Sequence, residues 1–205
     1  MNKKRSGQTC PIRYVFASFG HNCQKFYIPG SYVTIDENLE PFRGHCLFSQ
    51  YMPKKPVRYG IKIFALVHAR TFYACKLEIY TGIQHQGPYY VNNSSVEVVK
   101  RLTENLNSGR NVTVDKWYTS YELAKYLLQK NITLVGTISK NKREIPKEFL
   151  NNKNHKMHTS LFAFQKDITL MSYVSKRKTN LSTFYPQCIM TMVLTKQQVR
   201  QKSLK

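Results

Sequence analysis

The stretch NVTVDKWYTSYELAKYLLQKNITLVGTI, residues 111–138, has the clearest secondary-structure pattern of the chain. It opens with an alternating run, continues through residues 119–130, where leucines recur at helical spacing, and ends in the apolar run ITLVGTI at 132–138. A continuous apolar run is typical of a strand that is covered on both faces. Strand, helix and strand with short joints predict a βαβ unit, in which the two strands run parallel and the crossover is right-handed.

Two helices are expected around this unit, and each opens with a capping box. Ser94 and Thr119 each stand three residues before a glutamate, a pattern that marks helix starts. The helices are predicted to run from Ser94 to a stop at Gly109, and from Thr119 to Lys130. Their apolar faces are predicted to consist of Val96, Val99, Leu102 and Leu106, and of Leu123, Leu127 and Leu128.

Three strands are expected upstream. The run SYVTIDENL alternates, so that Val33 and Ile35 point to one face and Asp36 to the other. The aromatic and β-branched runs at 59–69 and 72–82 predict a hairpin, which gives a three-strand antiparallel unit. The predicted order is therefore β-β-β-α-β-α-β, an α/β fold in which a mixed sheet carries helices on its faces.

The remaining segments divide the chain by composition. Residues 1–30 are predicted to be a basic, irregular segment, and residues 31–175 the main domain. Within that domain, 139–175 is predicted to be a basic insertion followed by a β-hairpin over 160–175. Residues 176–205 are predicted to be a divergent basic tail, in which the run FYPQCIMTMVL has the pattern of one more strand.

Charge is the strongest compositional signal. The chain has 32 Lys and Arg against 11 Asp and Glu, a net charge of +21, which points to a polyanionic partner, most simply DNA. An acidic membrane surface would suit the charge equally, but no apolar run approaches the roughly 20 residues that a membrane span needs. The five cysteines are widely spaced with no CxxC pair, so zinc is not expected and a reducing, intracellular setting fits better. The charge also suggests a nuclear location.

Two similar tetrapeptides place aspartates at predicted strand ends, VTID at 33–36 and VTVD at 112–115. If the two strands are neighbours in one sheet, Asp36 and Asp115 converge, and two close carboxylates repel unless a cation lies between them. Mg²⁺ or Mn²⁺ suits such oxygen ligands. The competing interpretation is that each aspartate caps a turn through backbone N–H groups.

A phosphate-binding surface is expected from clustered cations, which release counterions when they neutralise phosphates. The competing interpretation is a solvated charge run that aids solubility. Beside Asp115, Trp117 and Tyr118 either stack on a base or pack the helix start against the sheet. The predicted nucleic-acid-binding residues are Lys54, Lys55, Arg58, Arg110, Lys116, Lys140, Lys142 and Arg143.

The blocks VTIDENLEPFRGHC, YMPKKPVRYGIKIFALV and NVTVDKWYTSYELAKYLLQKNITLVGTISKNKREIP, in this order, closely resemble the transposase domain of the piggyBac family. The resemblance runs from about Tyr32 to Tyr173. It implies an IS4-like DDE transposase with an RNase H-like fold, which agrees with the strand and helix order above. It also implies that Asp36 and Asp115 occupy the positions of the first two catalytic aspartates, with Mg²⁺ or Mn²⁺ as cofactor.

The family's third catalytic aspartate follows a Lys-Gly-Gly-Val segment, and the sequence contains no such segment. Asp167 lies within the predicted hairpin, where the family carries no catalytic acid, and neither Asp nor Glu follows it. The ending is one that a shifted reading frame or a missing exon would produce. Smaller departures are Lys116 in place of Asn, His45 in place of Arg, and Ser139 where Arg is common.

Three hypotheses follow. The first is a piggyBac-derived transposase core that keeps two of three acids, binds DNA and holds Mg²⁺ weakly, without strand-transfer activity alone. The second is a non-catalytic module that binds DNA or protein through its basic surface. The third is an active Mg²⁺-dependent transposase or nuclease whose missing acid comes from another chain. The expected partners are DNA and a related transposase chain, as a homo- or hetero-oligomer, and no membrane.

Overall fold

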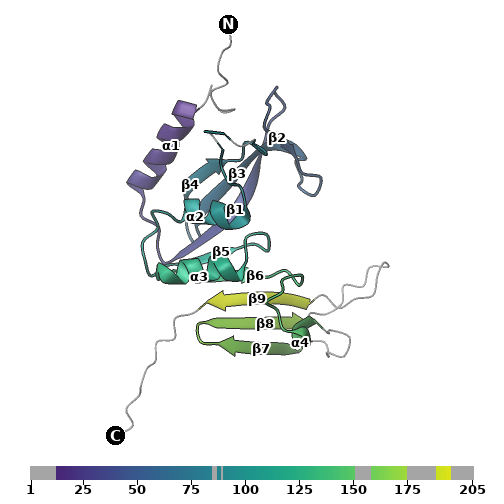
Figure 1. Cartoon of the computed structure of the whole chain (residues 1–205). Helices are drawn as coiled ribbons and strands as arrows, with labels where there is room; N and C mark the ends of the chain where they lie inside the picture. The colour runs from purple at the N-terminus through teal and green to yellow at the C-terminus, as the bar shows by residue number, and fades with distance from the viewer. Residues whose placement is uncertain (1–12, 85–86, 89, 151–157, 175–187, 195–205) are drawn as a thin grey trace. The chain divides into compact units, whose positions relative to one another are not determined.

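The computed structural model describes residues 13–84, 87–88, 90–150, 158–174 and 188–194. The chain forms two compact units, residues 1–110 and 111–205 (Figure 1). Strands and helices occur in both units, and the predicted α/β class is confirmed. Within these described ranges, no helix is long and apolar enough to cross a membrane.

The first unit is built around the central strand β3 (Tyr59–His68). β1 (Tyr32–Pro41) pairs with it in antiparallel orientation along one edge, from Val33 opposite His68 to Pro41 opposite Gly60. β4 (Ala74–Ile79) and the short β2 (Ser49–Tyr51) pair with β3 as well, both antiparallel. The predicted three-strand antiparallel unit is confirmed, and β2 is an additional short strand of this unit.

β1 extends five residues beyond Asp36, so the prediction that this strand ends at the aspartate is wrong. Its second half keeps the alternation through Leu39, which is buried. Gly60 makes the pairing possible, because a Cβ at this position would clash with the carbonyl oxygen of Glu40. The polar run DENLE therefore forms a strand because β3 provides its hydrogen-bond partners.

Residues 1–30 were expected to be irregular, but α1 spans Arg13–Phe26. Its inward-facing positions recur at helical spacing: Phe16 and Gly20 are half-buried, Cys23 is buried and Tyr27, just beyond the helix, is half-buried again. The helix packs against β4, where the hydroxyl of Tyr73, just before that strand, donates to the carbonyl oxygen of Cys23 at 3.1 Å.

α2 spans Ser95–Leu102 and packs on β3 and β4 through Val98, Val99 and Leu102. Ser94 is the N-cap residue as predicted, but its side chain makes no capping hydrogen bond. The helix also ends seven residues before Gly109, so the predicted stop is wrong. Side-chain donors satisfy carbonyl oxygens near this end: the Thr103 hydroxyl donates to the carbonyl oxygen of Val99 (2.8 Å), and the ammonium of Lys76 donates to that of Arg101 (2.6 Å).

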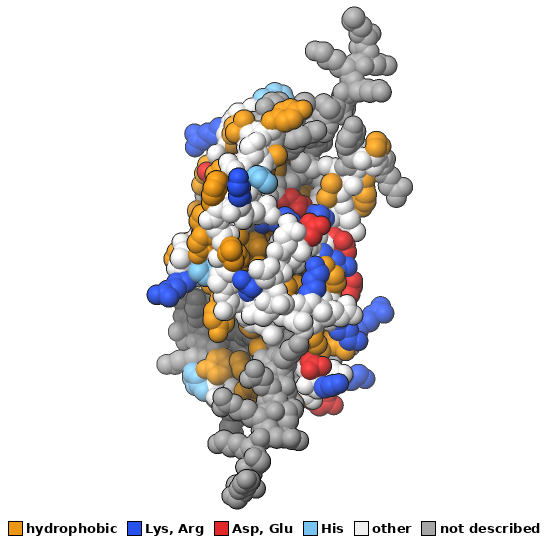
Figure 2. Space-filling model, turned by 90° about the vertical axis from the view of Figure 1, so that its left-hand side faces the viewer, with side chains coloured by type: hydrophobic (Ala, Val, Ile, Leu, Met, Phe, Trp, Pro, Cys, Tyr) orange, Lys and Arg blue, Asp and Glu red, His pale blue; other side chains and the backbone are white. Residues whose placement is uncertain are grey.

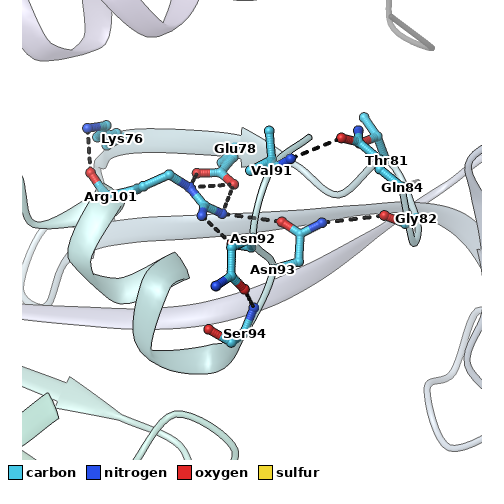
Figure 3. A network of polar contacts seen from close by, with 10 residues as sticks. All are labelled: Lys76, Glu78, Thr81, Gly82, Gln84, Val91, Asn92, Asn93, Ser94 and Arg101. Atoms are coloured by element: carbon cyan, nitrogen blue, oxygen red, sulfur yellow. Dashed lines mark hydrogen bonds and ion pairs between the residues drawn. The ribbon is translucent and has the colours of Figure 1, made fainter. Parts of the chain in front are cut away.

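A polar network joins α2 to β4 and to the loop between them (Figure 3). Arg101 forms an ion pair with Glu78, donating through Nε at 3.0 Å and through Nη2. The same guanidinium donates to the backbone carbonyl of Asn92 and, at 3.3 Å, to the side chain of Asn93. Asn92 Oδ1 accepts from the N–H of Ser94 at 2.9 Å. The start of α2 is thus fixed by the loop rather than by a capping box.

The second unit opens with the predicted βαβ motif. β5 (Asn111–Val114) and β6 (Thr133–Thr137) are parallel, and α3 (Tyr121–Gln129) connects them and packs on β6. The N-cap of α3 is Ser120 rather than Thr119, since the Ser120 hydroxyl accepts from the N–H of Leu123 at 3.2 Å. The core of this motif consists of Val112, Val114, Tyr118, Leu123, Ala124, Leu127, Ile132 and Leu134.

Three further strands complete this sheet in the order β5-β6-β9-β8-β7. β7 (Ser160–Gln165) and β8 (Ile168–Val174) form the predicted hairpin, and β9 (Cys188–Leu194) pairs antiparallel with both β8 and β6 (Figure 1). β9 confirms the further strand expected in the tail. In the described part of the basic insertion, α4 (Lys147–Leu150) is a short helix, of which Phe149 is buried.

Candidate functional site

Asp36 lies in the middle of β1 and points away from the core. Its strand neighbours Val33 and Ile35 are fully buried, whereas Asp36 is exposed, and its backbone lies opposite Ala65 of β3. One carboxylate oxygen accepts from the N–H of Glu37 at 2.8 Å. The pairing of β1 with β3 therefore fixes the backbone at Asp36, while the carboxylate is open to solvent.

A carboxylate and two cations lie beside Asp36. Glu37 is half-buried, and Lys55 lies 3.8 Å from its Oε1, with a further contact of 3.4 Å to its carbonyl oxygen. Burial raises the pKa of Glu37, the charge of Asp36 raises it further, and Lys62 and Lys55 oppose this. Burial also lowers the pKa of Lys62, which Glu37 partly offsets. Sequence reasoning missed Glu37 and Lys62.

Asp115 directly follows β5, as predicted, and begins the turn into α3. Its carbonyl oxygen accepts from the N–H groups of Tyr118 and Thr119 at 3.1 and 3.2 Å, and from the Thr119 hydroxyl at 3.0 Å. Its side chain is exposed. Gly136 of β6 lets this turn approach, because a Cβ there would clash with the Thr119 hydroxyl and lie 3.0 Å from the Val114 carbonyl oxygen.

The two aromatic residues after Asp115 differ in burial, and the packing role expected for the pair is seen for Tyr118. Tyr118 is fully buried and packs the start of α3 against the sheet, while Trp117 is 46% exposed. The two rings meet edge to face, with centroids 4.7 Å apart. Lys116 is exposed between Asp115 and this pair. Trp117 is thus held by packing and still presents part of its surface to solvent.

The basic loop after β6 is held by apolar residues. Ile145 and Phe149 are buried. Two turns form, in which the N–H of Lys142 donates to the carbonyl oxygen of Ser139 and the N–H of Ile145 donates to the carbonyl oxygen of Lys142. Lys142 and Arg143 are exposed, and Lys140 is half-buried. The loop therefore presents cations from a fixed backbone.

A groove of about 630 Å³ in the first unit is lined by two arginines, Arg43 and Arg58. Aromatic surface from Phe42 and Tyr59 lines it as well, and Tyr59 lies 4.7 Å, ring to ring, from Tyr51. Sequence reasoning found Arg58 but not Arg43, although the arginine follows directly on the Pro-Phe pair at the end of β1.

The other predicted cations differ in their surroundings. Arg110 donates to the carbonyl oxygen of Pro29 at 3.1 and 3.3 Å and to that of Ser108 at 3.0 Å, so its guanidinium holds the backbone together. Lys54 is exposed, and Lys55 pairs with Glu37. On the face drawn in Figure 2, Lys and Arg side chains are dispersed between hydrophobic and acidic ones rather than gathered into one block.

The described residues contain no group of three or more His, Cys, Asp or Glu side chains that could hold a metal ion. Asp36 and Asp115 each offer an exposed carboxylate, in the first and the second unit respectively. Oxygen donors of this kind suit a hard divalent cation such as Mg²⁺. Their convergence on one cation stays a prediction.

Comparison with known proteins gives consistent results. A family model described as Transposase IS4 matches residues 1–204. The cryo-EM structure of a piggyBac transposase synaptic complex with hairpin DNA is 37% identical with a TM-score of 0.78; the match covers 89% of this chain and 37% of that one. A trimeric exonuclease from Pyrococcus horikoshii OT3 aligns at 11% identity over 80% of this chain and 98% of that one, with a TM-score of 0.28, too low to support any argument. The chain belongs to the IS4 transposase family and is a piggyBac-type member of it.

Proposed function

We propose that this chain is a transposase-derived DNA-binding protein that keeps two of the three catalytic acids and does not cut DNA alone. The observation that carries the proposal is the groove of the first unit, in which Arg43 and Arg58 line the same concave surface. A guanidinium offers several N–H donors in a planar fork that matches phosphate oxygens. Exposed cations on the loop of the second unit, Lys142 and Arg143, supply a second set of phosphate contacts.

Binding to a fluorescein-labelled 30-base-pair duplex, measured by anisotropy at low salt, tests the DNA-binding part. The double variant Arg43→Gln/Arg58→Gln is expected to bind duplex at least tenfold more weakly, on the order of 1.4 kcal/mol. Arg70→Gln is the matched control, since Arg70 is an exposed arginine in the same unit, in the turn between β3 and β4. No measurable binding by the unmodified chain, or an equal loss in the control, would refute a role for the groove.

The metal part concerns Asp36 and Asp115. We infer that they hold a single Mg²⁺ or Mn²⁺ weakly, because the described residues contain no group of three or more acidic, histidine or cysteine side chains that could enclose a metal ion. A cation bound there would supply Lewis-acid polarisation of a phosphate and lower the pKa of a bound water. Asp36→Asn and Asp115→Asn should each abolish Mn²⁺ binding in isothermal titration. Unchanged binding in either variant would exclude that residue as a ligand.

Strand nicking tests the proposed lack of activity. With Mg²⁺ or Mn²⁺, the chain is expected to leave duplex that carries piggyBac-type terminal repeats intact, because loss of one member of a catalytic unit costs orders of magnitude in rate. A metal-dependent nicked product that disappears in Asp36→Ala would overturn this.

The chain spans 37% of the length of the piggyBac transposase that it matches, so the activities of the longer protein are proposals here. One such proposal is association with a related transposase chain. Restored nicking after mixing with an intact relative would support it, provided that the nicking is absent when this chain carries Asp115→Asn. A nuclear location is another, and imaging of the tagged chain tests it.

A further inference from the structure

Two phenylalanines on β7 are exposed to solvent and therefore do not contribute to the hydrophobic core. Phe162 and Phe164 are 49% and 76% exposed, although their rings are nearly parallel, with an interplanar angle of 7° and centroids 6.1 Å apart. Single exposed apolar residues are ordinary, but two aligned rings form an apolar patch of the kind that marks a binding surface.

Strand pairing places these rings on a larger aromatic face. Phe162 lies opposite Met171 of β8, Phe164 opposite Thr169, and Ser160 opposite Tyr173. Directly opposed residues share one face of an antiparallel pair, so Tyr173 lies on the same face as the two rings. The other face of β8 carries the buried Ser172 and Val174. β7 lies at the end of the sheet order, so the face with the rings borders a strand edge.

Cations lie near Phe164. This residue lines a cavity of about 300 Å³ together with Glu144, Ile145 and Pro146, and Ala163 and Leu170 of the opposite face line it as well, so the loop that follows β6 meets the hairpin from that opposite side. That loop carries the exposed Lys142 and Arg143 immediately before Glu144. Lys147 follows Pro146, and Lys166 lies in the turn between β7 and β8; both are exposed.

We propose that Phe162 and Phe164 form a platform on which unpaired bases of a DNA strand stack, with the neighbouring cations neutralising its phosphates. The proposal rests on the DNA-binding function proposed above and specifies its substrate class. Aromatic rings beside cations are the combination that single-strand binding surfaces use, because every base offers a π-face and every nucleotide a phosphate. In a duplex the base faces are stacked on one another, so the rings can contact them only where strands are unpaired.

A second copy of this chain is a weaker candidate for the same face. The net charge of +21 makes two copies repel, and the nearby loop carries more cations, Lys140, Lys142 and Arg143, than acids, of which it has Glu144. Self-association through the rings is therefore treated as an outcome that the experiment must detect.

The test compares single-stranded with duplex DNA of the same length, using anisotropy with the full chain at one fixed salt concentration. Phe162→Leu/Phe164→Leu keeps the apolar volume but removes the π-faces. This variant is expected to lose at least about fivefold in affinity for the single strand and less than about twofold for the duplex. Phe162→Tyr/Phe164→Trp keeps aromatic faces and should retain single-strand binding. Phe72→Leu is the matched control, since Phe72 is 82% exposed in the first unit.

The outcomes separate this proposal from the function on which it rests. If neither DNA binds the unmodified chain, DNA binding itself fails. If both bind and the leucine variant retains single-strand affinity, only the platform is refuted. An oligonucleotide of abasic sites should bind the unmodified chain as weakly as the leucine variant binds the normal strand, and equal affinity for both oligonucleotides would refute stacking. A dimer in sedimentation that the leucine variant dissociates would reassign the face to self-association.

Discussion

At the scale of single residues, backbone pairing and close packing hold Asp36 and Asp115 in place. Asp36 and Asp115 are both exposed. Pairing with β3 fixes the backbone at Asp36, and the close approach at Gly136 fixes the turn that begins with Asp115. The cluster of Glu37, Lys55 and Lys62 adds charge to a partly buried region directly beside Asp36. Both effects can be measured through stability.

Gly136→Ala should destabilise the chain by about 1–3 kcal/mol, because the added methyl group overpacks the turn against Thr119 and Val114. Chemical denaturation followed by circular dichroism measures the free energy of unfolding. Gly20→Ala is the matched control: it lies in α1 with no atom within 4 Å of its added Cβ, and should be neutral or stabilising by up to about 1 kcal/mol. Equal effects of the two substitutions would contradict the packing account.

Glu37 predicts a specific pH dependence. Its pKa in the folded chain is raised, chiefly by burial, so its contribution to stability is largest below its unfolded pKa and is lost as pH rises through the folded pKa. The chain should therefore gain stability relative to Glu37→Gln as pH falls from 7 toward 4.5. Parallel denaturation curves of the two proteins at several pH values measure this difference, and a difference that does not change with pH would show that the carboxyl is not perturbed.

At the scale of elements, the joint between β4 and α2 is fixed by charge and backbone hydrogen bonds (Figure 3). Arg101 binds Glu78 of β4 and two asparagines of the intervening loop, while Lys76 binds the carbonyl oxygen of Arg101. Hydrogen bonds of a charged group that is only partly exposed contribute more than those of a surface ion pair.

Arg101→Gln should lower the free energy of unfolding by about 1–3 kcal/mol, because it leaves Glu78 without its guanidinium partner. Hydrogen exchange should show faster exchange in α2 and in residues 90–94. Arg70→Gln, at an exposed turn, should change stability by less than about 0.5 kcal/mol. Unchanged exchange in α2 would indicate that apolar packing alone holds the helix.

Elements were predictable from sequence where local pattern and tertiary environment agree. The βαβ motif followed from the apolar run at 132–138, and the hairpin at 160–175 from alternation. The continuation of β1 beyond Asp36 was only partly predictable: the alternation reaches Leu39, but the polar residues at 36–40 stay in the strand through their pairing with β3. α1 was missed although Phe16, Gly20 and Cys23 have helical spacing, since glycine and aromatic residues have modest helix propensity.

Candidate site residues were predictable by type but not by environment. Exposure of Asp36 followed from strand alternation, whereas the contact of Arg110 with Pro29 joins residues 81 apart in the sequence. The groove of Arg43 and Arg58 likewise depends on how the β1–β2 connection folds back toward the start of β3. Sequence indicates which cations exist, and the fold decides which of them still face solvent.

At the scale of the whole molecule, the net charge of +21 is the main driving force expected for the proposed association with DNA. Each phosphate neutralised by a cation adds about 0.9 to the slope of log affinity against log salt. Lys142→Gln/Arg143→Gln should therefore reduce this slope by about 2 and weaken binding to all sequences similarly. Anisotropy titrations at several salt concentrations measure the slope. An unchanged slope in the double variant would show that Lys142 and Arg143 do not contact DNA.

One cysteine lies close to the groove and could carry a fluorescent label. Among those described, Cys23 and Cys75 are buried, whereas Cys46 is only half-buried and lies in the same connection as Arg43 and Gly44 of the groove. A maleimide dye should therefore react faster with Cys46 than with the other two. With Cys10 and Cys188 changed to serine, the native thiol becomes an attachment point for a fluorescent reporter, whose emission would register occupancy of the neighbouring groove without an engineered label site.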